Sequence, residues 1–208
     1  MAKSTKPSTA AGEAVDAPSR ADLTRTRIMQ AAVEAFAARG YHGTTTRDIA
    51  AAAGMSPAVV YVHHDSKEEL LYSIARSGHE ETLKAIQTAA TTADDPTAQL
   101  EAVIRAFVLH HVEGHTAARV INYELAALSD PHRAEIDSYR QAIDALFDDV
   151  VARGIEAGAF HLEHPRFAVV ALQSLGIDIA RWYREGGWSQ DDLAAAYVEM
   201  ALRIVGAG

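Results

Sequence analysis

The chain has no cysteine, which excludes disulfide bonds and metal sites built from thiolates. No apolar run approaches the roughly 20 residues that a transmembrane helix needs, and the N-terminus lacks the hydrophobic core of a signal peptide. The G-x-S-x-G motif of hydrolases and the glycine-rich phosphate-binding loop are also missing. We therefore expect a cytoplasmic protein that is not an enzyme, and we predict no cofactor, no metal site and no membrane partner.

Signals for the start and the end of a helix lie close together between residues 44 and 71. Thr45 can cap a helix, and Asp48 three residues later completes a capping box. Gly54 suits the left-handed conformation that ends a helix. A first short helix is therefore predicted between these two signals.

A second short helix follows at once. Ser56 suits its cap, and Pro57 suits its first turn, where no amide hydrogen is needed. Ser66, with Glu69 three residues on, predicts a third helix start with its own capping box. Two short helices joined by a tight turn predict a helix-turn-helix, whose second helix, here about 57–63, enters the major groove of double-stranded DNA.

The helix-turn-helix geometry assigns roles to the residues around the turn. Groups at the start of the first helix can hold a phosphate, because the amides and the helix dipole favour an anion. Arg47 can reach a phosphate or a guanine edge, whereas the small side chains that start the second helix suit thymine methyl groups. Tyr61 and His63 are expected at the DNA backbone, with Lys67 as a further phosphate contact. The predicted DNA-binding residues are Thr45, Thr46, Arg47, Ser56, Pro57, Ala58, Val59, Tyr61, His63 and Lys67.

The charge distribution agrees with DNA binding at one end. The formal net charge is -9, yet residues 20–70 hold six basic and six acidic side chains. Residues 71–208 hold 11 basic and 20 acidic ones, so the acidic excess lies in the C-terminal part. Because phosphates are repelled by an acidic surface, DNA is expected to approach the N-terminal part.

Several motifs in residues 24–71 are shared with one known family. They are the helix sequence IMQAAVEAFAARGYHGTT, the threonine pair before Arg47, the Gly54-x-Ser56 turn, the Tyr61-x-His63 pair and the segment SKEEL. With these motifs the region resembles the DNA-binding domain of TetR-family transcriptional repressors. The resemblance implies a ligand-responsive repressor that a small-molecule inducer releases from a palindromic operator. One position departs from it, because the family usually has an aromatic residue where this chain has His64, so we expect different packing beneath the second helix.

The rest of the chain has helical periodicity and no strand-like alternation, which predicts an all-α fold of about nine helices. The predicted domains are a disordered N-terminal arm (1–20), a three-helix helix-turn-helix domain (21–66) and a helical ligand-binding and dimerisation domain (67–208). Helices are expected over about 66–90, 96–113, 116–128, 130–158, 165–184 and 189–205.

The last two predicted helices differ from the others in how widely their apolar residues spread. Between 165 and 184 these residues cover most of the helix circumference, and the last helix has two apolar stripes. In the TetR-like family these helices form a four-helix dimer interface, so the resemblance implies a homodimer through about 165–184 and 189–205. The alternative is that they are ordinary core helices of a monomer.

A TetR-like body encloses a ligand pocket, so polar or aromatic residues on apolar helix faces are candidate contacts. The segment 181–187, RWYREGG, resembles one found in TetR-like regulators that sense CoA thioesters, whose phosphates arginines can hold. Equally, these arginines could satisfy the carbonyls at a helix end. The predicted ligand-binding residues are His79, Phe107, His110, His111, Arg119, Tyr123, Tyr139, Gln173, Ile177, Asp178, Arg181 and Trp182.

Three alternatives remain open from the sequence. His110, His111 and His115 could hold a metal, although Gly114 weakens the helix that would carry them. The chain could be a helical ligand-binding or interaction protein without a DNA-binding role. It could also be a multidrug-type efflux regulator with an apolar cationic ligand. For a regulator, we expect ligand to tilt the long helix that starts at Ser66 and so to change the spacing between two DNA-binding heads.

Overall fold

The computed structural model describes residues 19–207, and most of the predicted N-terminal arm lies outside them. Within the described part the chain forms nine α-helices, one 3-10 turn and no strand, which confirms the all-α prediction. The elements are α1 (Arg20–Arg39), α2 (Thr46–Ala52), α3 (Pro57–His63), α4 (Lys67–Ala90), α5 (Pro96–Glu113), α6 (His115–Glu124), η1 (Leu125–Ala127), α7 (Asp130–Glu156), α8 (Pro165–Trp182) and α9 (Gln190–Ile204).

Local capping determines where several helices begin. Thr45 and Asp48 form the predicted capping box of α2. A similar box at Ser19 starts α1 at Arg20, so residues 19 and 20, which were predicted to belong to the arm, form the start of this helix. Ser66 caps α4 by accepting from the Glu69 amide, but the reciprocal half of the predicted box is not formed.

The two helices of the predicted helix-turn-helix meet at a turn that needs glycine. Gly54 has a φ of 65°, in the left-handed region that a side chain disfavours. Ser56 occupies the N-cap position of α3 as expected, although its side chain makes no capping hydrogen bond. The turn is therefore set by Gly54 and by Pro57 in the first turn of α3.

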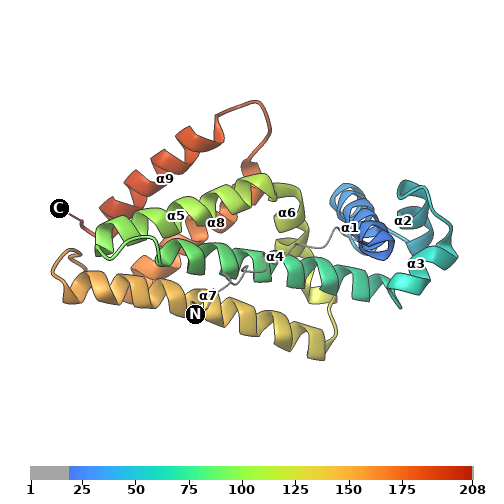
Figure 1. Cartoon of the computed structure of the whole chain (residues 1–208), viewed down its shortest axis with the longest axis horizontal. Helices are drawn as coiled ribbons and strands as arrows, with labels where there is room; N and C mark the ends of the chain where they lie inside the picture. The colour runs from blue at the N-terminus through green and yellow to red at the C-terminus, as the bar shows by residue number, and fades with distance from the viewer. Residues whose placement is uncertain (1–18, 208) are drawn as a thin grey trace, which may run out of the picture.

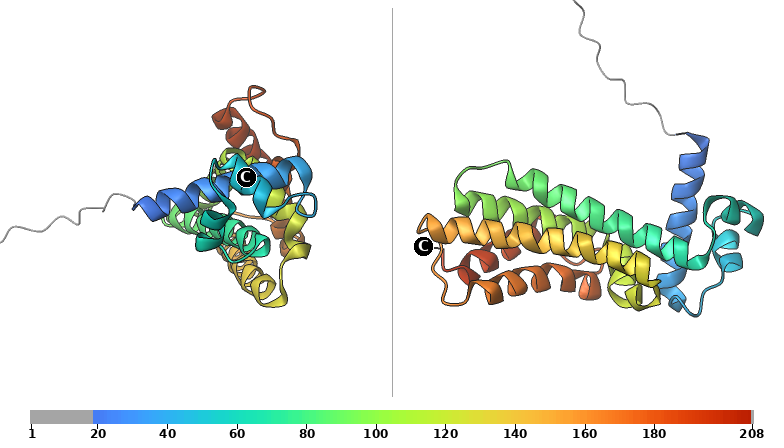
Figure 2. Two further views of the ribbon diagram at one scale, coloured as in Figure 1. Left: turned by 90° about the vertical axis from the view of Figure 1, so that its right-hand side faces the viewer. Right: turned by 90° about the horizontal axis from the view of Figure 1, so that it is seen from below.

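The molecule is elongated, with α1–α3 gathered at one end (Figures 1 and 2). We call α1–α3 the head and α4–α9 the body. The long helix α4 leads from the head into the body, where α7 packs along it and α5 packs against α4, α8 and α9. None of the described helices is long and apolar enough to cross a membrane.

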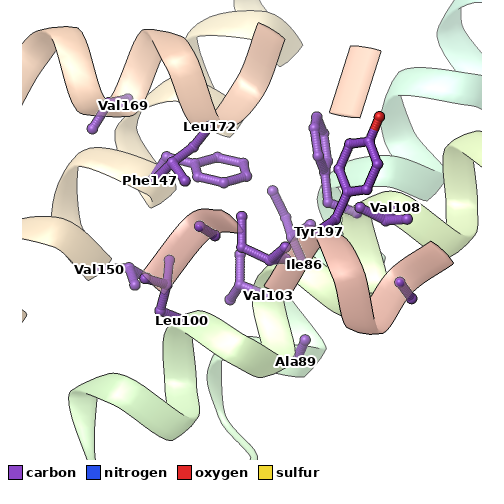
Figure 3. Close-up of a cluster of buried hydrophobic side chains, with 14 of the residues drawn as sticks. Ile86, Ala89, Leu100, Val103, Val108, Phe147, Val150, Val169, Leu172 and Tyr197 are labelled. Atoms are coloured by element: carbon purple, nitrogen blue, oxygen red, sulfur yellow. The ribbon is translucent and has the colours of Figure 1, made fainter. Parts of the chain in front are cut away.

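Two clusters of buried apolar side chains hold these helices together. The larger lies in the body, where Phe147, Leu172 and Val103 come from three different helices (Figure 3). The second joins the head to the near end of the body, since Ile28 and Val60 share it with Leu70, Ile121 and Ile136. The division of domains at residue 66 remains a prediction, and apolar packing crosses it.

Candidate functional site

The helix α3 presents an exposed face at the end of the head. Val60 is fully buried and anchors the helix, whereas Val59 and Tyr61 beside it are exposed. Ser56, Pro57 and Ala58 in the first turn are exposed too, and His63 is half-buried. The residues expected to face bases therefore lie on one accessible surface, as a recognition helix requires.

The start of α2 adjoins this surface. Thr46 Oγ1 and Tyr61 Oη lie 2.9 Å apart and form a hydrogen bond between α2 and α3. Arg47 is exposed on the same turn. The hydroxyl of Thr45, in contrast, donates to the Asp48 carboxylate at 2.7 Å and accepts from the Asp48 amide, so it is already used within the helix cap.

Lys67 does not lie free at the surface, as its predicted phosphate contact would require. Its ammonium donates to the backbone oxygens of Tyr41 at 2.7 Å and Thr44 at 2.9 Å. It also sits 4.1 Å from the centroid of the Tyr41 ring, within cation–π range. Lys67, the first residue of α4, thus ties this helix to the segment between α1 and α2.

His64 lies beneath α3, where the resemblance predicted altered packing. The side chain is 4% exposed, and Nε2 is buried with no hydrogen-bond partner among the described residues. Burial lowers the pKa of His64 below its usual value, with further contributions from Arg25 and His63. An uncharged imidazole therefore occupies the position where an aromatic ring was expected.

A cavity of about 400 Å³ lies in the body between α4, α5, α6, α7 and α8. This size falls within the usual range for small-molecule sites. The cavity brings together seven of the predicted ligand-binding residues, namely His79, Phe107, His110, His111, Tyr123, Gln173 and Ile177. Its lining also includes Thr82, Asn122, Arg133 and Arg140, which were not predicted.

Helical spacing contained a signal for most of these unpredicted residues. Thr82 follows His79 by three positions, which places both on one face of α4. Arg133 and Arg140 are seven positions apart on α7 and also share a face. Asn122 directly precedes Tyr123, and the sequence offered no separate signal for it.

Two cavity histidines are shielded from water. His111 is 8% exposed, and burial lowers its pKa to about 4. Burial also lowers the pKa of His79. Each ring uses Nδ1 in a hydrogen bond to the backbone oxygen four residues earlier, Phe107 at 2.8 Å and Ala75 at 2.7 Å. Both imidazoles are therefore uncharged at neutral pH.

A shallower groove adjoins the cavity and shares Asn122, Tyr123 and Ile177 with it. It contains Arg119 and Arg181, two of the predicted ligand contacts. Arg181 donates twice to Asp178, at 2.6 and 2.9 Å, and this pair holds the pKa of the Asp178 carboxyl below its usual value. The groove thus adds Arg119 and Arg181 to the two arginines, Arg133 and Arg140, that line the cavity itself.

Tyr139 and Trp182 line neither of these two spaces. The Tyr139 phenol on α7 interacts with Arg76 on α4. Trp182 packs against the body core and lies edge-on to Trp188 at 5.7 Å between centroids. Helical periodicity placed both on partly apolar faces but could not tell which neighbour would cover them.

The three histidines considered for a metal do not converge. Nδ1 of His115 lies 3.0 Å from the Val112 oxygen, and Nδ1 of His111 is bonded to Phe107. In residues 19–207 the group whose ligand atoms lie close enough for a metal is Glu68, Glu69 and His132.

Comparisons with known proteins cover both halves of the chain. Residues 28–74 match the family model described as bacterial regulatory proteins, tetR family, and residues 93–205 match that of the tetracyclin repressor-like C-terminal domain. The repressor KstR2 of Rhodococcus jostii (strain RHA1) is 28% identical over 181 residues, which is 86% of this chain and 89% of the relative.

Solved structures agree with these matches. A regulatory protein in the tetR family from Rhodococcus RHA1 has a TM-score of 0.84 and 41% identity, over 92% of this chain and all of the other. AibR, solved in complex with isovaleryl coenzyme A and operator DNA, has a TM-score of 0.76 and 24% identity, over 85% of this chain and 97% of that one. This is a family of transcriptional regulators rather than of enzymes. The chain belongs to the TetR family and is a ligand-responsive, DNA-binding transcriptional regulator.

Proposed function

We propose that the chain is a homodimeric repressor whose two heads bind a palindromic operator and whose body binds an acyl-CoA inducer. The observation that carries the proposal is a bridge at Tyr41 between the head and the walls of the cavity. The Tyr41 amide donates to Glu124 at the end of α6, and its carbonyl accepts from Lys67 at the start of α4. Both helices line the cavity, so a ligand that displaces either one also displaces the head.

For the DNA contact, the exposed first turn of α3 is the proposed reader of base edges. Its small side chains at Ser56, Pro57 and Ala58 suit shape recognition and thymine methyl contacts. Thr46, Arg47, Tyr61 and His63 are the proposed backbone contacts. Thr45 and Lys67 are assigned supporting roles instead, because their polar groups are engaged within the head.

For the dimer, we propose the faces of α8 and α9 that the body leaves uncovered. Phe167 is 73% exposed, and Val170 and Ile177 on the same face of α8 are exposed as well. Met200 is a large apolar side chain exposed on α9. Large apolar side chains gathered on one surface mark an interaction site, and regulators of this family are typically dimers.

For the inducer, the joined cavity and groove suit a molecule with an apolar end and an anionic end. The cavity can enclose an acyl group, while Arg119 and Arg181 in the groove can bind phosphates. AibR, a protein of the same fold, was solved with an acyl-CoA and its operator. A cationic ligand is disfavoured, because Arg133 and Arg140 line the cavity and Glu81, an acidic residue of the lining, is exposed.

The bridge gives the proposal a mechanism. A ligand that separates α4 from α6 pulls Lys67 and Glu124 apart, and Tyr41 cannot keep both hydrogen bonds in place. The head then rotates and the two recognition helices no longer match their half-sites. Because the coupling is reciprocal, operator DNA must weaken ligand binding by the factor by which ligand weakens operator binding.

The test begins with duplexes that the purified protein selects from a random library, followed by titration in fluorescence anisotropy. Arg47→Ala and Tyr61→Phe should weaken binding at least tenfold, while Arg105→Ala, on an exposed site of α5, should not. Octanoyl-CoA should release wild-type protein from DNA and should release a Glu124→Leu variant poorly. Equal octanoyl-CoA affinity for free and DNA-bound protein would refute the mechanism.

A further inference from the structure

The hydrogen-bonding groups inside the cavity share one feature that points to the chemistry of the ligand. Three cavity side chains on α4 and α5 each use their hydrogen-bond donor on the backbone oxygen one helical turn earlier. His79 Nδ1 bonds to Ala75, Thr82 Oγ1 donates to Gly78 at 2.7 Å, and His111 Nδ1 bonds to Phe107. These three side chains therefore offer no donor to the cavity.

The state of each atom follows from these bonds. A carbonyl oxygen can only accept, so Nδ1 carries the proton in both imidazoles. Because burial keeps the rings uncharged, Nε2 is an unprotonated acceptor. The Thr82 hydroxyl has given its hydrogen to Gly78, so its oxygen can only accept from the cavity.

These acceptors lie at the enclosed end of the cavity. Thr82 is 6% exposed and His111 is 8% exposed. No hydrogen-bond partner for His111 Nε2 is found among residues 19–207, and this atom is not among the fully buried ones, so it borders the cavity space. The other lining residues that carry donors are less buried: His110, Arg133 and Gln173 are half-buried, and Asn122, Tyr123 and Arg140 are exposed.

We propose that the enclosed end of the cavity binds a hydrogen-bond donor, and that the part of the ligand lying there is an uncharged apolar group bearing a hydroxyl. Within the proposed function, on which this step rests, that part is a hydroxylated acyl chain on coenzyme A. An unsubstituted alkyl chain would bury the acceptor atoms of Thr82 and His111 without partners. Binding would then lose the free energy of hydrating these two atoms and gain no hydrogen bond in return. An anionic or carbonyl group in the same place would face lone pairs and be rejected.

The test compares two isomers of equal size that differ in one donor. Octanol can donate to the wall, whereas heptyl methyl ether has an oxygen but no donor. By isothermal titration calorimetry, wild-type protein should bind octanol about tenfold more tightly than the ether. Thr82→Val and His111→Phe should each reduce this preference to about threefold or less. Thr88→Val is the matched control, because Thr88 makes the same backbone bond to Lys84 on the exposed side of α4 and should retain the full preference.

A second pair separates the inference from the proposed function. Octanoyl-CoA and its omega-hydroxy counterpart are titrated in the same way. If octanol is preferred but neither thioester binds, the hydroxyl inference holds and the acyl-CoA inducer is refuted. If both thioesters bind with equal affinity, and octanol binds no more tightly than the ether, the hydroxyl inference is overturned and the acyl-CoA inducer stands. The inference also fails if neither octanol nor the ether binds, or if both variants keep the wild-type preference.

Discussion

Acidification between pH 7 and pH 5 should destabilise the protein, mainly through the buried side chain of His111. Its pKa is about 4 in the folded protein, and that of an exposed histidine is about 6.5. As the pH falls below 6.5 the unfolded chain binds a proton that the folded chain does not bind until near pH 4. The stability is therefore complete above pH 6.5 and is lost as the pH falls toward 4.

The size of the effect follows from these two values. Over the whole window the loss amounts to about 3 kcal/mol, and between pH 7 and pH 5 it is about 2 kcal/mol. Burial lowers the pKa of His64 and His79 in the same direction, so they add to the loss. The lowered carboxyl pKa values of Asp48 and Asp144 act at more acidic pH, since their ordinary value is already 3.8.

The assay is urea unfolding followed by circular dichroism at pH 7 and pH 5, at one fixed protein concentration because a dimer is expected. His111→Gln should reduce the difference in unfolding free energy between the two pH values by about 2 kcal/mol. Any packing cost of the substitution occurs at both pH values and cancels. His161→Gln, at an exposed imidazole, should keep the wild-type difference. If His111→Gln also keeps the wild-type difference between the two pH values, His111 is not the source of the pH dependence.

Three further substitutions test other parts of the structure. His64→Phe removes the unpartnered Nε2 beneath α3 and should stabilise the protein by about 1 kcal/mol in thermal unfolding; destabilisation would contradict this. Gly154→Ala places a Cβ 1.9 Å from the Phe160 ring and should lower the free energy of unfolding by about 1–3 kcal/mol. Gly158→Ala is the comparison: its Cβ meets no neighbour, so only the left-handed backbone of Gly158 opposes the substitution. Phe167→Glu on α8 should shift the protein to monomers in light scattering, whereas Leu23→Glu, exposed on α1, should leave the mass unchanged.

Local motifs were predictable because the atoms that make them are neighbours in the chain. The Thr45–Asp48 box and the left-handed Gly54 need only a few residues of backbone, and both occur as predicted. Ser66 and Glu69 show the limit of this reasoning. The Glu69 carboxylate lies 3.7 Å from His132 of α7, a distant residue that the spacing of a capping box cannot reveal.

Residue type predicted which side chains could bind DNA or a ligand, but not which groups of the folded chain would contact them first. A lysine beside a helix-turn-helix suits a phosphate, yet folding brings the backbone of Tyr41 and Thr44 to Lys67 first. The cavity shows the same limit of prediction from residue type. Seven predicted residues line it because apolar periodicity identifies inward faces, whereas Tyr139 and Trp182 point from similar faces to other neighbours.

The link between head and body uses backbone atoms of Tyr41, which explains why no sequence motif indicated it. Any residue with an amide hydrogen at position 41 can keep both the bond to Glu124 and the bond from Lys67, whereas the ring contacts with Lys67, Phe36 and His42 depend on tyrosine. A substitution such as Tyr41→Leu should therefore leave ligand-dependent DNA release largely intact. Tyr41→Pro removes the amide donor to Glu124 and should uncouple α6 from the head even if the protein still binds DNA. Release by octanoyl-CoA that is unchanged in the proline variant would place the coupling in α4 alone.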